Sequence, residues 1–72
     1  MVKPQLYPAE TLVRGDSLSI PGTSILLEIA ESRPSTVSGS YWTLEGKTGW
    51  IMDMGNVPGR KVWAVKKESH NG

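Results

Sequence analysis

The residues that could support catalysis are few and scattered in this sequence. The two aspartates, Asp16 and Asp53, lie far apart along the chain, and the one histidine, His70, lies close to its end. The chain contains no cysteine, so it offers neither a thiol nucleophile nor a thiolate ligand for a metal. It also lacks a phosphate-binding glycine loop and a nucleophile-elbow serine. We therefore predict a protein that is not an enzyme and that uses no metal and no cofactor.

Aromatic side chains are the first residues suited to binding. The chain has three tryptophans and no phenylalanine, so a small core would have to use tryptophan as its large aromatic residue. We expect Trp42 in the core and at least one of Trp50 and Trp63 partly exposed. An exposed tryptophan beside Tyr41 would form an aromatic patch, which suits a peptide groove or the stacking of nucleic-acid bases. The alternative is that all three tryptophans belong to the core.

Basic residues gather toward the carboxyl end of the chain. Residues 56–67 contain four basic residues and no acidic one, whereas residues 1–55 hold more acidic than basic residues. The four are Arg60, Lys61, Lys66 and Lys67. A basic edge favours an acidic partner, either a protein or a nucleic acid. Charge also protects an exposed edge strand from pairing with other chains, so the alternative is a solvated edge with no partner.

The start of the chain offers a further contact element. Pro4 and Pro8 bracket Leu6 and Tyr7, which rules out a regular helix there. We expect residues 1–8 to form an extended and mobile arm. Because such an arm has no core of its own, its apolar and aromatic side chains are predicted to order on a protein partner.

Short alternating segments are the elements that must position all of these residues. We expect a single small β domain at residues 9–67, with one helical turn near its start, a long loop at 32–39 and a frayed tail at 68–72. The predicted strands are residues 17–20, 24–31, 40–45, 48–54 and 61–66. About five short sequential strands without a long helix indicate a mostly β fold, an antiparallel sheet or barrel of the SH3-like or OB-like kind.

The size and composition of the chain bear on its number of domains and on its cellular location. A chain of 72 residues forms one domain. Its apolar runs, such as residues 25–27, are far too short to span a membrane, and its first residues lack the apolar core of a signal peptide, so we expect a cytoplasmic protein with no membrane contact. The tripeptide Arg14-Gly15-Asp16 resembles an integrin recognition sequence, but in this setting it predicts a turn between two apolar segments.

One stretch of the predicted hairpin resembles a known family. Bacterial SH3 domains have a tryptophan-containing strand followed by Gly-Lys-Thr-Gly-Trp-Val. The matching residues are Trp42 and then Gly46-Lys47-Thr48-Gly49-Trp50-Ile51. The resemblance implies a small SH3-like barrel and a module that binds peptides or cell-wall material. The chain departs from the family because a further strand with Trp63 follows the hairpin and no export signal precedes it.

A second resemblance is one of kind and has no motif behind it. Short, cysteine-free, single-domain β proteins with an extended arm are similar to small phage-encoded regulators of host RNA polymerase. It implies a non-enzymatic regulator that acts in the host cytoplasm on the transcription machinery through protein–protein contact. The predicted contact residues are Leu6, Tyr7, Tyr41, Trp50 and Trp63. The alternatives are a nucleic-acid-binding small barrel that uses the basic residues, and the SH3-type peptide or cell-wall module.

Overall fold

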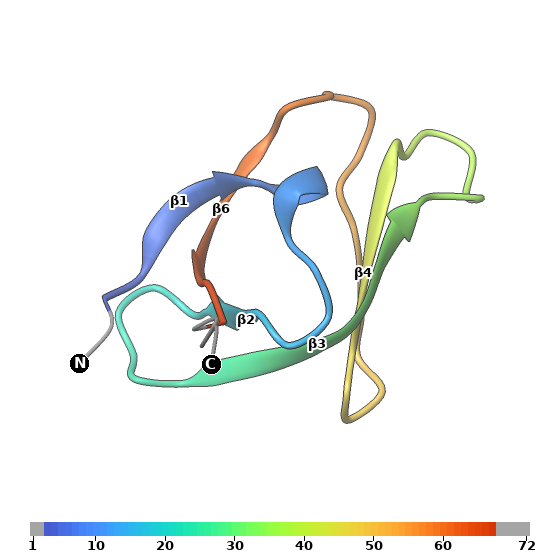
Figure 1. The fold of residues 1–72 in the computed structure, drawn as a ribbon. Coiled ribbons are helices and arrows are strands. Elements are labelled where there is room, and N and C mark those ends of the chain that lie inside the picture. Colours follow the sequence, from blue (N-terminus) through green and yellow to red (C-terminus); the bar gives the residue numbers. More distant parts are fainter. Residues whose placement is uncertain (1–2, 68–72) are drawn as a thin grey trace, which may run out of the picture.

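The computed structural model describes residues 3–67, which form one antiparallel sheet of six strands (Figure 1). The strands lie in the spatial order β1-β6-β2-β3-β4-β5. Their bounds are β1 Gln5–Pro8, β2 Ser17–Ser19, β3 Leu26–Pro34, β4 Trp42–Gly46, β5 Ile51–Asp53 and β6 Lys61–Val65, and one 3-10 turn, η1, spans Ala9–Thr11. The prediction of a mostly β fold made of short antiparallel strands is confirmed.

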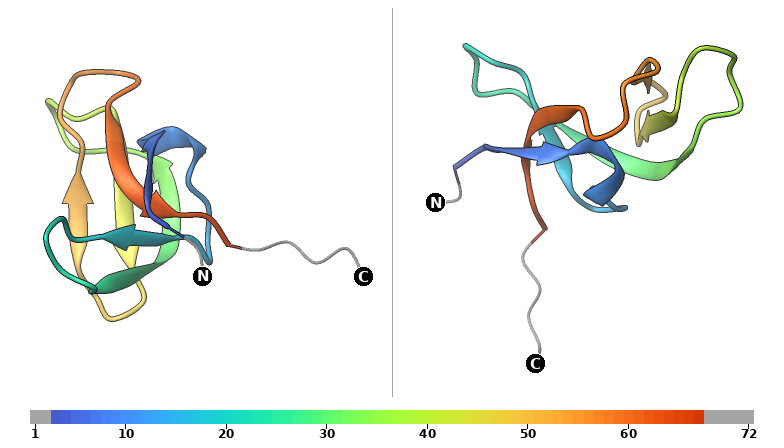
Figure 2. Two further views of the ribbon diagram at one scale, coloured as in Figure 1. Left: turned by 90° about the vertical axis from the view of Figure 1, so that its left-hand side faces the viewer. Right: turned by 90° about the horizontal axis from the view of Figure 1, so that it is seen from above.

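The sheet curls into a half-barrel (Figure 2). The long strand β3 belongs to both halves of the sheet, because it pairs with β2 through its first residues and with β4 through its last. The register between β3 and β4 shifts between Ile29 and Glu31, and such an irregularity bends a strand and increases its twist. The half-barrel stays open on one side, because β5 pairs only with β4 among the described strands.

A small aliphatic core fills the curled sheet. Its buried side chains are Ala9, Leu12, Leu18, Ile29, Leu44, Met54 and Ala64. They come from five strands or their immediate neighbours and from η1, so residues far apart in the chain meet in one cluster. Full burial of a leucine or isoleucine side chain stabilises the fold by about 1.5–3 kcal/mol, so Leu12, Ile29 and Leu44 are principal contributors.

Trp42 does not lie inside this core. It is half-buried and packs against the outside of the cluster. Its indole N–H donates a hydrogen bond to Ser32 Oγ at 2.8 Å, on the neighbouring strand β3. The expectation of a core position is wrong, because the indole N–H needs a polar partner and finds it nearer the surface of the sheet.

Residues 5–8 do not form a separate arm. They make up β1, which pairs antiparallel with β6 and places Leu6 opposite Trp63. Tyr7 packs against the core. The prediction of an arm that orders only on a partner is therefore wrong for these residues. The flanking prolines are compatible with pairing because β1 is an edge strand, and a proline there need not donate to a neighbour.

Two further segments differ from the prediction. β3 continues to Pro34 because Pro34 pairs with Trp42, so the expected long loop starts three residues later. The strand expected at residues 48–54 is reduced to β5, because its first residues belong to the turn, where the Gly49 N–H donates to the Gly46 carbonyl at 3.0 Å and Gly49 has a positive φ of 106°. The predicted frayed tail at residues 68–72 lies outside the described residues.

Candidate functional site

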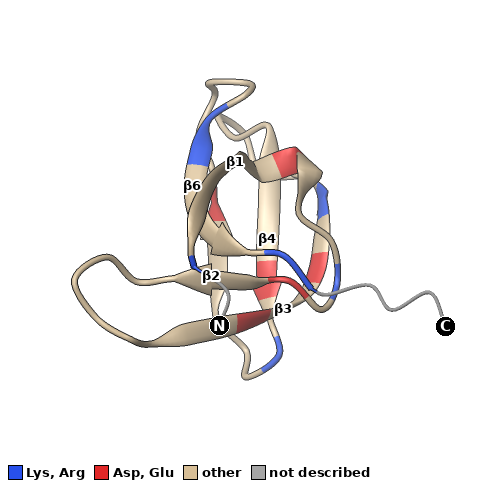
Figure 3. Cartoon of the chain, turned by 60° about the vertical axis from the view of Figure 1, so that its left-hand side comes forward, with Lys and Arg blue, Asp and Glu red and all other residues tan. Residues whose placement is uncertain are grey.

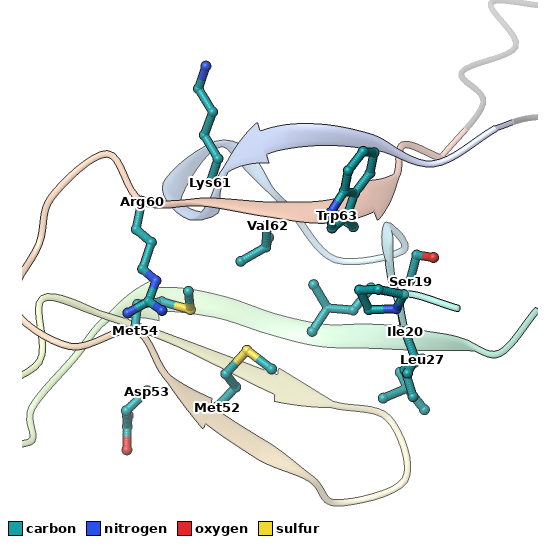
Figure 4. Close-up of a pocket in the computed structure, with 12 residues that line it drawn as sticks. Ser19, Ile20, Leu27, Met52, Asp53, Met54, Arg60, Lys61, Val62 and Trp63 are labelled. Carbon is teal, nitrogen blue, oxygen red and sulfur yellow. The ribbon is translucent and has the colours of Figure 1, made fainter. Parts of the chain in front are cut away.

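An open groove lies where the half-barrel fails to close (Figure 4). It has a volume of about 510 Å³ and is bounded by β6 on one side and by residues of β2, β3 and β5 on the other. Leu18 and Met54, which line it, also belong to the buried core. The groove is therefore a part of the apolar interior that reaches solvent.

Side chains from four segments surround this groove. Figure 4 shows Val62 of β6 pointing toward the β5 side, where Met52 and Met54 lie, with Leu27 and Ile20 at the other end. Met52 is 39% exposed and Ile20 is 36% exposed, so the apolar surface is accessible. Methionine side chains adapt to irregular partners because they are unbranched and polarizable. The arrangement can accept apolar side chains.

Trp63 and Leu6 form a second apolar feature. They lie opposite one another on β6 and β1, and they are 45% and 49% exposed. Figure 4 shows Trp63 directed to the other side of β6 from Val62. A shallow hollow of about 330 Å³ adjoins Trp63 and is also lined by Pro21. The prediction that at least one of Trp50 and Trp63 is partly exposed is confirmed.

The other aromatic residues predicted to contact a partner pack against the core. Tyr7, Tyr41 and Trp50 are all half-buried there. The Tyr41 hydroxyl donates to Glu10 Oε1 at 3.0 Å and accepts from the backbone N–H of Arg60 at 3.2 Å. Burial, and then the Glu10 carboxylate, raise the pKa of the Tyr41 hydroxyl above its ordinary value. Tyr41 thus holds the backbone of Arg60 in place.

The four basic residues fall into two pairs at opposite ends of β6 (Figure 3). Arg60 and Lys61 are exposed and line the groove. Lys66 instead places its Nζ 2.6 Å from Asp16 Oδ2, and the backbone N–H of Lys67 donates to Asp16 Oδ1 at 2.7 Å. The four basic residues therefore do not lie together on one edge, and a contact of any of them with an acidic partner stays a prediction.

Asp16 is the centre of the second pair. Its side chain is 1% exposed, and it also accepts a hydrogen bond from the backbone N–H of Val13 at 2.9 Å. Burial alone would raise the pKa of this carboxyl, but the hydrogen bonds from Lys66, Lys67 and Val13 outweigh it and hold the pKa below its ordinary value. The predicted turn is present, since the Asp16 N–H donates to the Val13 carbonyl at 3.0 Å. Asp16 is therefore a structural anchor and not an exposed recognition residue.

Sequence reasoning missed the main groove residues. Met52, Met54, Leu27 and Val62 were expected on sheet faces, yet nothing in the sequence indicates that their faces meet at an opening. The available signal was the alternation of Met52 and Met54, which places both methionines on one face of the strand. The turn at Asp16 was predicted, but the role of Asp16 as a buried anchor for Lys66 and for the backbone of Lys67 was missed.

The described residues lack two kinds of feature. Within residues 3–67, no group of three histidine, cysteine, aspartate or glutamate side chains is placed to hold a metal ion. The same part of the chain contains no helix that is both long enough and apolar enough to cross a membrane. His70 lies outside these residues.

Comparison of the chain with protein-family models, with curated proteins and with solved structures found no match. The resemblances to bacterial SH3 domains and to phage regulators therefore remain predictions from the sequence. The functional argument depends on the groove and the charges around it.

Proposed function

We propose that this chain is a non-enzymatic binding protein whose groove takes an extended segment of a partner protein. The observation that carries the proposal is the continuity of the groove with the core. Apolar surface at Met52, Ile20 and Val62 is left open to solvent at the one side where the sheet does not close. Small monomeric proteins rarely expose connected apolar surface of this kind unless it serves an interaction.

Two features favour a protein partner over a nucleic acid. Single-stranded nucleic acids bind through aromatic side chains on which the bases stack, together with basic residues along the backbone path. Here the groove is lined mainly by aliphatic and methionine side chains. Trp63 is the aromatic residue among those that line it, and its ring projects to the other side of β6 from Val62. Lys66, one of the four basic residues, is already paired with Asp16.

The proposal is tested with a library of random twelve-residue peptides selected against the immobilised protein. We expect enriched peptides to shift the amide resonances of residues in β5 and β6 in the nitrogen-15 spectrum of the protein. M52E should abolish this binding, because it places a charge in the apolar groove. The matched control is V37E, which adds the same charge at an exposed residue outside the groove.

Peptides whose shifts map away from the groove, or that bind M52E as tightly as the unchanged protein, would contradict the proposal. The resemblance in kind to phage regulators makes host RNA polymerase the first whole protein to examine. Capture from a nuclease-treated bacterial lysate should then succeed with V37E and fail with M52E. A partner that disappears after nuclease treatment would favour the nucleic-acid alternative.

A further inference from the structure

The groove lies between the free edge of β5 and the first residues of β6, which have no partner strand on the side away from β1. β5 pairs with β4 on one side, and within residues 3–67 no strand pairs with its other side. Residues 61–63 of β6 pair with β1, whereas the pairing of β6 with β2 involves only Ala64 and Val65. The loop 54–60 joins the two strands without pairing them with one another (Figure 2). The two open edges and the groove between them form what we call the seam.

The two outer edges of the sheet differ in how they are protected. The β1 edge is flanked by Pro4 and ends at Pro8, and prolines discourage the addition of another strand. β5, which spans Ile51–Asp53, contains no proline, lysine or arginine. Its short length limits open-ended stacking of many chains, but its backbone groups remain able to pair with one short segment. The β5 edge of the seam is therefore the edge of the sheet that can accept a strand.

Charge at the mouth of the seam indicates what this strand carries. Arg60 and Lys61 both line the groove, and within residues 3–67 neither forms a salt bridge. Figure 4 shows Arg60 extending toward Met54, whereas Lys61 projects to the other side of β6. The backbone of Arg60 is fixed, because its N–H donates to the Tyr41 hydroxyl at 3.2 Å and its carbonyl accepts from the Ala9 N–H at 2.9 Å. One acidic residue, Asp53, also lines the groove, and its Oδ1 accepts from Thr43 Oγ1 at 2.6 Å. Arg60 is thus the cation that is directed into the groove, at a defined end of it.

We propose that the partner segment adds to the open edge of β5 as a β-strand and places a carboxylate against Arg60. This inference rests on the proposed function. Alternate side chains of the added strand face the sheet interior, so apolar residues at every second position would contact Met52 and Val62. A guanidinium binds a carboxylate through paired hydrogen bonds, which fixes the register of the strand.

The test uses the tightest-binding peptide from the selection described above, synthesised with neutral ends. Each carboxylate of the peptide is changed in turn to its amide, and each backbone amide is methylated in turn. We expect the change of one particular carboxylate, the one that contacts Arg60, to weaken binding about fivefold, and the other carboxylate changes to have little effect. We expect methylation at alternate positions to weaken binding about tenfold, because it removes main-chain hydrogen bonds to β5. Affinities are measured by isothermal titration.

The contribution of Arg60 is isolated with R60Q and with R14Q as the matched control, since Arg14 is exposed and lies outside the groove. With R60Q, the peptide and its amide form should bind equally, whereas R14Q should preserve the fivefold difference. If no carboxylate change weakens the peptide, or if all methylated forms bind as tightly as the parent peptide, strand addition is overturned and groove binding stays intact.

If no selected peptide binds in the groove at all, the proposed function is overturned as well. If the protein dimerises through the seam, the occupant is a second copy of the chain, and both proposals are overturned.

Discussion

The two ends of β6 carry the same kind of residue in different surroundings. At the carboxyl end, Lys66 and the backbone of Lys67 bind the buried Asp16, which ties the end of the strand to the turn after η1. At the amino end, Arg60 and Lys61 have no ionic partner within residues 3–67 and lie beside the groove. The first end stabilises the fold, and the second has charge available for a partner.

This difference shows that a run of basic residues cannot be treated as one functional unit. A cation that already satisfies a buried carboxylate contributes to stability and adds little to binding. An unpaired cation beside an apolar groove costs little stability when it is removed and can add affinity and orientation to a complex. Separate measurements of stability and binding at the two ends of β6 therefore test this difference.

The largest effect is expected from D16A. The substitution removes the acceptor for two backbone N–H groups and for Lys66 Nζ, so it should lower the free energy of unfolding by about 3 kcal/mol. The measurement is urea denaturation followed by tryptophan fluorescence. The control is E28A, because Glu28 is exposed and its contact with Lys47 spans 3.9 Å, so its loss should stay within about 0.5 kcal/mol. Similar losses for both variants would mean that Asp16 is not an anchor.

A smaller effect is expected from a matched pair of lysine variants. K66M should lower the free energy of unfolding by about 1 kcal/mol, a modest value because the Lys66 side chain is 36% exposed and its ion pair is partly screened by water. K61M should change stability by less than about 0.5 kcal/mol, since Lys61 is exposed and unpaired among the described residues. Thermal denaturation of the two variants side by side gives the comparison. Equal losses of stability in K66M and K61M would show that the two ends of β6 do not differ in this way.

The smallest effect is a dependence of stability on pH at the Asp16 end. The folded state holds the pKa of Asp16 below its ordinary value of 3.8, so the unfolded state binds the proton more tightly. The stabilisation is present above that ordinary value and is lost as the pH falls through the lower pKa of the folded state. The thermal midpoint of the unchanged protein should therefore decline in this acidic range more steeply than that of D16N. Parallel curves for the two proteins would show that Asp16 does not contribute to the acid sensitivity.

Local pattern predicted much of the fold and part of the site. The alternation of apolar and polar side chains in residues 17–20 and 40–45 predicts strands, because this period of two can be seen in the sequence alone. The turn at Asp16 was also predictable, since glycine and aspartate favour it locally. For the site, the same reasoning identified Trp63 as a candidate exposed residue and Arg60 and Lys61 as candidate contact residues.

Local pattern and composition therefore predict the class of structure and the types of side chain available at the surface. They do not predict which strands are neighbours, because strand pairing joins distant parts of the chain, and this pairing makes residues 5–8 the edge strand β1 and not an arm. They also do not predict which cations remain unpaired, because the ion pair between Lys66 and Asp16 joins residues 50 positions apart. The groove exists because β5 and β6 lie on either side of an opening in the sheet. It could not be predicted from the sequence, because periodicity along one strand carries no information about the strand across from it.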